Sequence, residues 1–352
     1  MSLRGRLYRG ETQIDFIRDR RRYFVLSAVL ITVSLGSLIF RGLDGSVDFT
    51  GGTIIEAENR SNADDSQVLA ALEGFGLGSV RVQFTSGTGG ERVRVQTEAV
   101  STDAQDELVM AIAAVVGVAF DETNVDAVGP TFGAEITRRA ITALIWFLLV
   151  VAAFIAIRFE AKMSAAAIGA LFHDLVITAG IYSVVGFQVT PATVIAVLTI
   201  LGYSLYDTVV VFDKITENVR ELSGRYTYTE IANLSMNQVL MRSVNTSLTS
   251  LLPIGSLLFV GSFLLGATTL REFALALFIG VTAGTYSSIF IATPLLTMWK
   301  EREPEWQRMR TRAIRRGTVD PLLVDESQAE MAQEFRDSGA VARPPRKRRK
   351  RR

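Results

Sequence analysis

The stretch PATVIAVLTILGYSLYDTVVVF, residues 191–212, indicates the fold class of this chain of 352 residues. Its side chains are apolar or small almost throughout, and Asp207 is its only charged residue. A helix needs about 20 mostly apolar residues to cross a hydrocarbon core of roughly 30 Å. The stretch is therefore long enough to form a membrane-spanning helix.

Five further apolar runs have the same character. They are rich in Gly, Ala, Ser and Thr, which let helices pack closely in lipid. The first run follows a basic cluster and lacks a small-residue cleavage site near its end, so we expect an anchor, not a cleaved signal peptide. The five runs are residues 23–40, 141–157, 163–187, 244–265 and 273–298. The sequence therefore predicts an α-helical polytopic membrane protein with six transmembrane helices.

Lys and Arg residues in short loops tend to stay in the cytoplasm, and this rule sets the expected orientation. The N-terminus is basic and the chain ends in RKRRKRR, residues 346–352, so both termini are expected in the cytoplasm. Loops 158–162 and 213–242 carry Lys and Arg on the same side. Arg138 and Arg139 do not fit, since they precede the second span on the opposite side, where the long loop before them weakens the rule.

These features divide the chain into five expected parts. They are a cytoplasmic N-terminus (1–22), the first span (23–40), an extracytoplasmic domain (41–137), a bundle of spans two to six (138–299, with the cytoplasmic loop 213–242) and a basic cytoplasmic tail (300–352). The tail is charged and lacks sustained apolar periodicity, so it is predicted to be mostly disordered. Its terminal basic run either attracts anionic lipid or ribosomal RNA, or is a solvated segment that helps to set the topology.

Residues 41–137 have the composition of a soluble domain. Alternating patterns and turn residues predict strands at 53–58, 79–85, 92–97 and 122–128, and helices at 63–73 and 102–116. The order strand, helix, strand, strand, helix, strand is that of the ferredoxin-like split unit. The alternative is that a short mixed segment fits this order by chance. We expect an inserted α+β domain of the ferredoxin-like type.

Composition excludes several classes of function. The chain has no cysteine and a single histidine, which excludes thiolate metal sites, cysteine nucleophiles and a multi-histidine metal centre. Its 37 basic and 36 acidic residues give a net charge of +1, so no specific nucleic-acid partner is expected. It has no phosphate loop, nucleophile elbow or metal-ligand cluster. We therefore predict neither an enzyme nor a cofactor, and any ATP hydrolysis would occur in another subunit.

Ionisable residues inside spanning helices cost about 2.5 to 3.5 kcal/mol on insertion scales, so each is a functional candidate. Desolvation favours the protonated form of Asp207, which can then bind and release a proton as access changes. The alternative is a hydrogen-bonded Asp that holds helices together. His173 and Asp174 interrupt the third span roughly 16 Å from its cytoplasmic end. For these two residues, a proton-relay role and a packing role remain equally open.

Arg242 has two readings. If the fifth span begins near its apolar run, Arg242 lies at the membrane interface with its head in water. If the helix begins near Thr229, Arg242 lies deeper and can pair with Asp207 as a two-state switch.

Several local motifs together resemble the SecF family of protein-export membrane proteins, from about residue 14 to residue 298. VDFTGGT (47–53) resembles the signature at the start of its extracytoplasmic domain, and Gly129-Pro130 resembles the entry to its second span. The third to fifth spans are similar through IRFE (157–160), His173-Asp174, GYS (202–204), DTVVVFD (207–213), Arg242 and NTS (245–247). The motif residues singled out are Asp48, Gly51, Gly52, Gly202, Ser204 and Asp213.

The resemblance implies half of an RND-type bundle, completed by SecD, with a ferredoxin-like extracytoplasmic domain. The implied function is to use the proton motive force in late steps of Sec-dependent preprotein export across the cytoplasmic membrane. Asp207 would be the proton-responsive acid and Arg242 its basic partner, while Tyr206 departs from the Asn expected before that acid. The implied partners are SecD, the SecYEG channel, YajC, the translocating preprotein and membrane lipids.

Two alternatives stay open on the sequence. A free-standing RND-type proton-coupled exporter of a small molecule or lipid would need a complete bundle, of which six spans supply half. A membrane-anchored scaffold would use its intramembrane acids only for structure.

Overall fold

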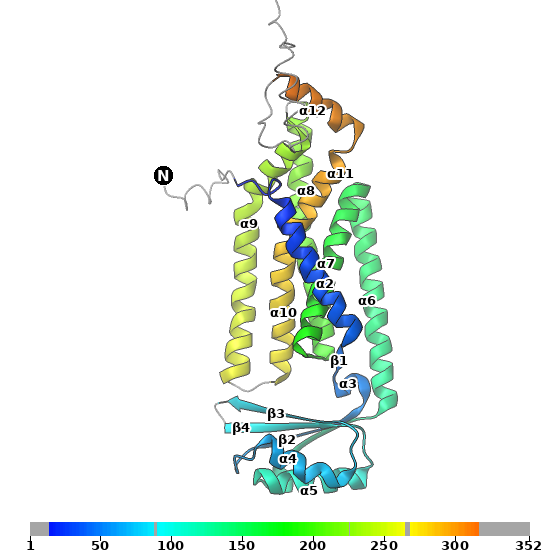
Figure 1. Ribbon diagram of the computed structural model, residues 1–352, viewed down its shortest axis with the longest axis vertical. Helices are drawn as coiled ribbons and strands as arrows, with labels where there is room; N and C mark the ends of the chain where they lie inside the picture. The colour runs from blue at the N-terminus through cyan, green and yellow to red at the C-terminus, as the bar shows by residue number, and fades with distance from the viewer. Residues whose placement is uncertain (1–13, 88–89, 225, 265–267, 317–352) are drawn as a thin grey trace, which may run out of the picture.

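The computed structural model describes residues 14–87, 90–224, 226–264 and 268–316. Figure 1 shows a bundle of long helices with a small sheet at one end, while the described N- and C-terminal segments lie together at the opposite end. The sheet end and the terminal end therefore face away from each other along the helix axes.

Within the described residues, six helices are long and apolar enough to cross a membrane, as predicted. Two of these spans contain short π-helical segments, η3 and η4, and the last continues through η4 into α11. The helices are α2 (Arg20–Phe40), α6 (Pro130–Arg158), α7 (Ala161–Val185), α8 (Pro191–Leu222), α9 (Tyr228–Ser256) with η3 (Leu257–Leu264), and α10 (Thr268–Ser287) with η4 (Ser288–Ala292) and α11 (Thr293–Lys300).

Helix α6 begins eleven residues before the apolar run that predicted it, at Pro130 instead of residue 141. Proline suits the first helical position because its missing N–H would have no partner there. Arg138 and Arg139 therefore lie within the helix, in a polar section that precedes the apolar run. Both are paired with Glu135, at 3.4 Å and 2.8 Å respectively. Their local pairing explains how two arginines are accommodated at this end of the bundle.

The inserted unit has the predicted order of strands and helices. Strands β2 and β4 are central in a four-stranded antiparallel sheet of order β3-β4-β2-β5, and α4 and α5 cover the face away from the bundle (Figure 1). Fully buried Val68, Val93, Leu108 and Ile112 form part of the core between sheet and helices. The elements are β2 (Gly52–Glu58), α4 (Asp65–Leu72), β3 (Val80–Gly87), β4 (Gly90–Thr97), α5 (Thr102–Val116) and β5 (Asn124–Val128), with 3-10 turns η1 (Glu73–Phe75) and η2 (Phe120–Glu122).

A short connection joins this unit to the bundle. Strand β1 (Asp44–Gly45) pairs in parallel with β6 (Gln188–Val189), which lies between α7 and α8. The one-turn helix α3 (Val47–Thr50) then leads into β2. The chain entering the inserted unit is thus hydrogen-bonded to the loop between two membrane helices.

Helix α10 packs closely on α8 because two glycines of α10 face α8. A Cβ atom at Gly284 would lie 2.8 Å from Ser204 Cβ, and one at Gly280 would overlap Ile200. Small residues at such contacts let backbones approach, which is the usual basis of tight packing in lipid. The polar residues of α7, α8 and α10 are consequently drawn together inside the bundle.

The tail prediction was wrong for the segment after the last span. Residues Pro304–Arg316 form a helix, α12, where disorder was expected from residue 300. Trp306 is 5% exposed and packs edge-on against Tyr228, with ring centroids 4.9 Å apart. Burial of this aromatic side chain anchors α12 on the start of α9. The remainder of the tail, including the basic run 346–352, lies outside the described residues.

Candidate functional site

Two aspartates are buried in the middle of the helical bundle. Asp174 on α7 is fully buried, and Asp207 on α8 is 5% exposed. Both were singled out from the sequence, and both lie in helices that qualify as membrane spans. A buried carboxylate requires hydrogen-bond partners, so the geometry of the site is defined by the groups around each acid.

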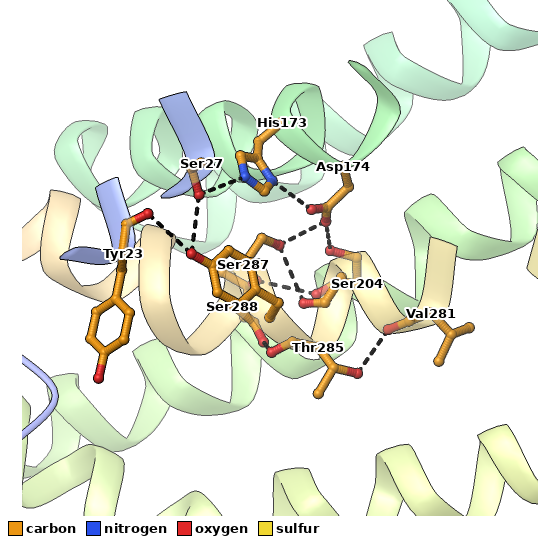
Figure 2. A network of polar contacts seen from close by, with 12 residues as sticks. Tyr23, Ser27, His173, Asp174, Ser204, Val281, Thr285, Ser287 and Ser288 are labelled. Carbon is orange, nitrogen blue, oxygen red and sulfur yellow. Dashed lines mark hydrogen bonds and ion pairs between the residues drawn. The ribbon is translucent and has the colours of Figure 1, made fainter. Parts of the chain in front are cut away.

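Asp174 is held by side chains from three helices. Its Oδ2 accepts hydrogen bonds from Ser204 Oγ on α8 at 2.6 Å and from Ser287 Oγ on α10 at 2.8 Å (Figure 2). Its Oδ1 lies 3.0 Å from Nδ1 of His173. The carboxyl group thus joins α8 and α10 to α7 through direct side-chain hydrogen bonds.

His173 continues the network towards the start of α2. Its Nε2 lies 3.1 Å from Ser27 Oγ, the Ser27 hydroxyl donates to the Tyr286 hydroxyl at 3.2 Å, and Tyr286 donates to the Tyr23 carbonyl at 3.1 Å (Figure 2). The ring is 6% exposed and faces a carboxyl group on one side and a hydroxyl group on the other. Side chains in hydrogen-bond contact therefore form a continuous line from Asp174 to the first span.

Asp207 is bonded by two serine hydroxyls. Its Oδ1 accepts from Ser243 Oγ on α9 and its Oδ2 from Ser288 Oγ at the start of η4, each at 2.6 Å. In the described part of the chain no Lys or Arg side chain forms an ion pair with Asp207. Its partners are therefore neutral groups that can both donate and accept a hydrogen bond.

Arg242 does not form the ion pair with Asp207 that the sequence suggested. Helix α9 begins at Tyr228, as the deeper placement of Arg242 requires, but the guanidinium donates from Nη2 to the Tyr206 hydroxyl at 2.8 Å. It also lies over the Tyr206 ring, 5.9 Å from the centroid. Consecutive residues of a helix point about 100° apart, so Tyr206–Arg242 and Asp207–Ser243 form two separate layers between α8 and α9. Tyr206 is 49% exposed, which places the arginine contact on the outside of the bundle.

The structure brings some of the predicted residues together and separates others. His173, Asp174, Ser204 and Asp207 share the buried site. Asp213 of α8 instead pairs at 2.8 Å with Arg158, the last residue of α6. Asp48 accepts from Ser46 at 2.9 Å in α3. Gly51 and Gly52 lie at the entry to β2, and Gly202 faces Phe147 of α6.

Sequence reasoning missed the serines that complete the site. Ser27, Ser243, Ser287 and Ser288 are all buried, and each bonds to one of the acids or to His173. The available signal was the pair of adjacent hydroxyl residues at 287–288 inside an apolar run. Serine is so common in tightly packed spans that this signal was not distinctive.

Comparison with known proteins now identifies the family. Residues 107–302, which include both buried acids, match the family described as Protein export membrane protein SecD/SecF, C-terminal. The Protein translocase subunit SecF of Streptomyces coelicolor is 40% identical over 316 residues, covering 89% of this chain and 84% of that protein. The chain belongs to the SecD/SecF family. Within the family, SecF of Mycobacterium tuberculosis is also 40% identical, over 331 residues covering 91% of this chain and 75% of that protein.

Solved structures of the family share the fold. The crystal structure of SecDF, a translocon-associated membrane protein from Thermus thermophilus, aligns with a TM-score of 0.75 at 34% identity. A second structure, of SecDF in a super-membrane-facing form, aligns with a TM-score of 0.59 at 32% identity. In each case the alignment covers 86% of this chain and 40% of the SecDF chain. The chain thus corresponds to a part of SecDF, and it is a multi-pass membrane protein of this family.

Proposed function

We propose that this chain is a SecF subunit of the Sec protein translocase that assembles with SecD and uses the proton motive force in late steps of preprotein export. The chain covers 84% and 75% of the length of two relatives named Protein translocase subunit SecF. The Thermus SecDF chain, of which this chain covers 40%, supports pairing with a SecD-like partner. SecYEG, YajC, the preprotein and membrane lipids are the further partners of this proposal.

The proposed architecture is half of an RND-type bundle carrying a ferredoxin-like domain. The order of strands and helices and the antiparallel strand order β3-β4-β2-β5 support the ferredoxin-like assignment. We place the domain boundaries at about residues 41 and 137, so that α6 starts within the inserted segment and continues into the bundle.

The proposed orientation has both termini in the cytoplasm of a cell with an inner membrane and the inserted domain outside. The start of α2, the connection between α6 and α7, the C-terminal part of α8 and α12 lie at the end of the bundle away from the sheet (Figure 1). By sequence, these segments contain Arg22, Lys162, Lys214 and Arg310. Positive residues near span ends favour the cytoplasmic side.

The proton-driven part of the proposed function rests on the environment of Asp207. This residue is 5% exposed, lies in a spanning helix and is hydrogen-bonded to the hydroxyls of Ser243 and Ser288. A carboxyl without a fixed cationic partner can take up a proton when access to it changes. Uptake neutralises the acid and weakens its bonds to α9 and η4, which frees these segments to shift. Asp207 is thus the proposed proton acceptor.

Asp174 and His173 form a proposed second proton-exchanging unit, connected to α2 through Ser27. Arg242 is the proposed basic partner of Asp207 in another state of the bundle. It is adjacent to Ser243, so a rotation of α9 by about 100° would bring the guanidinium beside Asp207 in place of the serine. The Tyr206–Arg242 contact holds the arginine away from the acid in the state described here.

The first prediction tests the role of Asp207 in export. Asp207→Asn should abolish the stimulation of preprotein translocation by the proton motive force, because Asn keeps the shape and the hydrogen-bonding capacity but does not titrate. The measurement is translocation into inverted membrane vesicles that contain the full chain and its SecD partner, with and without an imposed proton gradient.

Glu217→Gln is the matched control, since this acid lies on the same helix, α8, and is paired with Lys214 at an exposed position. It should leave the stimulation unchanged. Full stimulation in Asp207→Asn would favour the scaffold alternative instead. A different outcome would favour the free-standing exporter. In that case the chain purifies without a SecD partner, and Asp207→Asn abolishes proton-coupled transport of a small molecule.

A further inference from the structure

Two consecutive serines connect the two buried acids. Ser287, the last residue of α10, donates to Asp174 at 2.8 Å, and Ser288, the first residue of η4, donates to Asp207 at 2.6 Å. Both serines are fully buried. One dipeptide thus contributes a hydrogen bond to each acid (Figure 2 labels both serines).

Each of these hydroxyls has a second acceptor within reach. Ser287 Oγ lies 3.2 Å from the Gly284 carbonyl, and Ser288 Oγ lies 3.2 Å from the Thr285 carbonyl. A hydroxyl has a single proton, so the bond to the acid and the bond to the backbone are alternatives. A charged carboxylate is the better acceptor, whereas a protonated carboxyl can itself donate to the serine oxygen. The protonation of each acid therefore selects the direction in which its serine donates.

The backbone at this point is suited to a change between two arrangements. The regular α-helix ends at Ser287 and the π-helical segment begins at Ser288. Such segments interrupt the normal hydrogen-bond register and often occur at functional sites. On the α10 side of the boundary between Ser287 and Ser288, Gly284 is in close contact with Ser204, which also donates to Asp174. This contact restrains α10 against α8, so a local change is concentrated at residues 287 and 288.

We propose that Ser287 and Ser288 are positioning residues that couple the protonation of Asp174 to the protonation of Asp207. A proton bound to Asp207 Oδ2 turns the Ser288 hydroxyl towards Thr285, and the shared peptide bond transmits this change to Ser287. The carboxylate of Asp174 then loses a donor and binds its own proton more readily. The inference deepens the proposed proton-driven function and rests on it for its biological meaning.

The other titratable or charged groups around the two acids come from each packed helix. They are Tyr23 on α2, His173 on α7, Tyr203 and Tyr206 on α8, Arg242 on α9 and Tyr286 on α10. Of these, His173 bonds to Asp174, and Arg242 bonds to Tyr206. The two serines are the groups that contact one acid each and are joined covalently to one another.

The second prediction tests this coupling by chemical labelling. N,N′-dicyclohexylcarbodiimide modifies protonated carboxyls in apolar surroundings, and mass spectrometry quantifies the label at each acid across a pH series. The full chain is used in membranes that also contain its SecD partner. Asp207→Asn, which mimics the protonated acid, should raise labelling of Asp174 several-fold at neutral pH, and adding Ser288→Ala should abolish this rise, although Ser288 bonds only to Asp207 of the two acids.

Ser243→Ala is the matched control. It also removes a 2.6 Å bond from Asp207, but it lies on α9 and is not adjacent to a donor of Asp174. Added to Asp207→Asn, it should leave the rise in Asp174 labelling in place. Ser288→Thr retains the hydroxyl, and in the same background it should also leave the rise in place.

Labelling of Asp174 that is unchanged or lower in Asp207→Asn would overturn the proposal, because loss of the neighbouring negative charge alone favours the ionised form of Asp174. A rise that persists when Ser288→Ala is added would overturn it as well. If Ser288→Ala fails to accumulate, the reciprocal test uses Asp174→Asn, which should raise labelling of Asp207, and Ser287→Ala, which should abolish that rise when it is added; a rise that persists would contradict the coupling. Full export by Asp207→Asn would remove the proton-driven function but would not alter the labelling result, so the two failures are distinguishable.

Discussion

At the scale of the residue, the motif at 47–53 is explained by two glycines. Gly51 has φ 78° and Gly52 has φ 150°, conformations that other residues rarely adopt. A Cβ at Gly51 would lie 2.8 Å from the Pro130 Cα at the start of α6, and one at Gly52 would overlap the Thr97 carbonyl oxygen of β4. The glycines therefore allow β2 to begin against both the sheet and the second span.

Gly52→Ala should destabilise the inserted domain by about 2 kcal/mol or more, because strain in φ and overlap with Thr97 add together. Thermal unfolding of the purified full-length chain, followed with limited proteolysis of the domain, measures the loss. Gly74→Ala is the control within the same domain, as no atom lies within 4 Å of its Cβ position. Equal stability of the two variants would contradict the explanation of the motif.

At the scale of the element, the first turn of α4 is closed by a reciprocal cap. Asp64 accepts from the Gln67 N–H at 2.9 Å while the Gln67 side chain accepts from the Asp64 N–H at 3.0 Å. The Ser66 hydroxyl and the backbone N–H of Gln67 hold the pKa of Asp64 below its ordinary value of 3.8. The helix start therefore prefers the charged form of this acid.

A lowered pKa in the folded state means that the cap stabilises the domain fully above about pH 3.8 and loses this contribution as the pH falls through the folded value. Asp64→Asn should retain the cap and reduce the acid-induced fall in melting temperature. Asp64→Ala should lower the melting temperature at neutral pH as well. Melting curves of the full chain at neutral and acidic pH distinguish these outcomes, and identical acid sensitivity in Asp64→Asn and wild type would count against the cap.

At the scale of the whole molecule, α10 extends from the inserted domain to the buried acids. Near its domain end, Glu272 lies 3.7 Å from Arg94 of β4, which also contacts Glu56 at 3.2 Å. Beside this contact, Gln188 donates to Gln96 at 2.7 Å. The domain is thus docked on the bundle through polar contacts, and α10, the helix that carries Glu272, ends at Ser287.

Glu272→Gln should loosen this docking and broaden the distances between domain and bundle, because a partly buried ion pair is replaced by a neutral contact. The chain has no cysteine, so a pair of introduced cysteines, one in β3 and one in α7, can carry spin labels for pulsed electron resonance without background. Arg92→Ala is the control, since Arg92 lies on the same strand and pairs with Glu56 at 4.0 Å within the domain. A distance distribution that is unchanged in Glu272→Gln would show that the remaining contacts, among them the β1–β6 pairing and the Gln188–Gln96 bond, hold the domain.

The sequence by itself determined the features that depend on neighbouring residues. Hydropathy over about 20 residues identified six spans, and alternation with turn residues identified the order of strands and helices in the inserted unit. The rarity of acids in apolar runs identified Asp174 and Asp207, and the ordered motifs identified the family. These signals are local, so folding does not need to be known to detect them.

Only the tertiary structure decided which groups meet. The partners of Asp207, Ser243 and Ser288, lie 36 and 81 positions away along the chain, and their meeting depends on the rotation of each helix about its own axis. The same rotation directs Arg242 to Tyr206 instead of Asp207. Docking of α12 likewise depends on a surface that α9 provides for Trp306. A periodic sequence specifies that a helix forms, whereas close packing between helices specifies which of its faces meets a given neighbour.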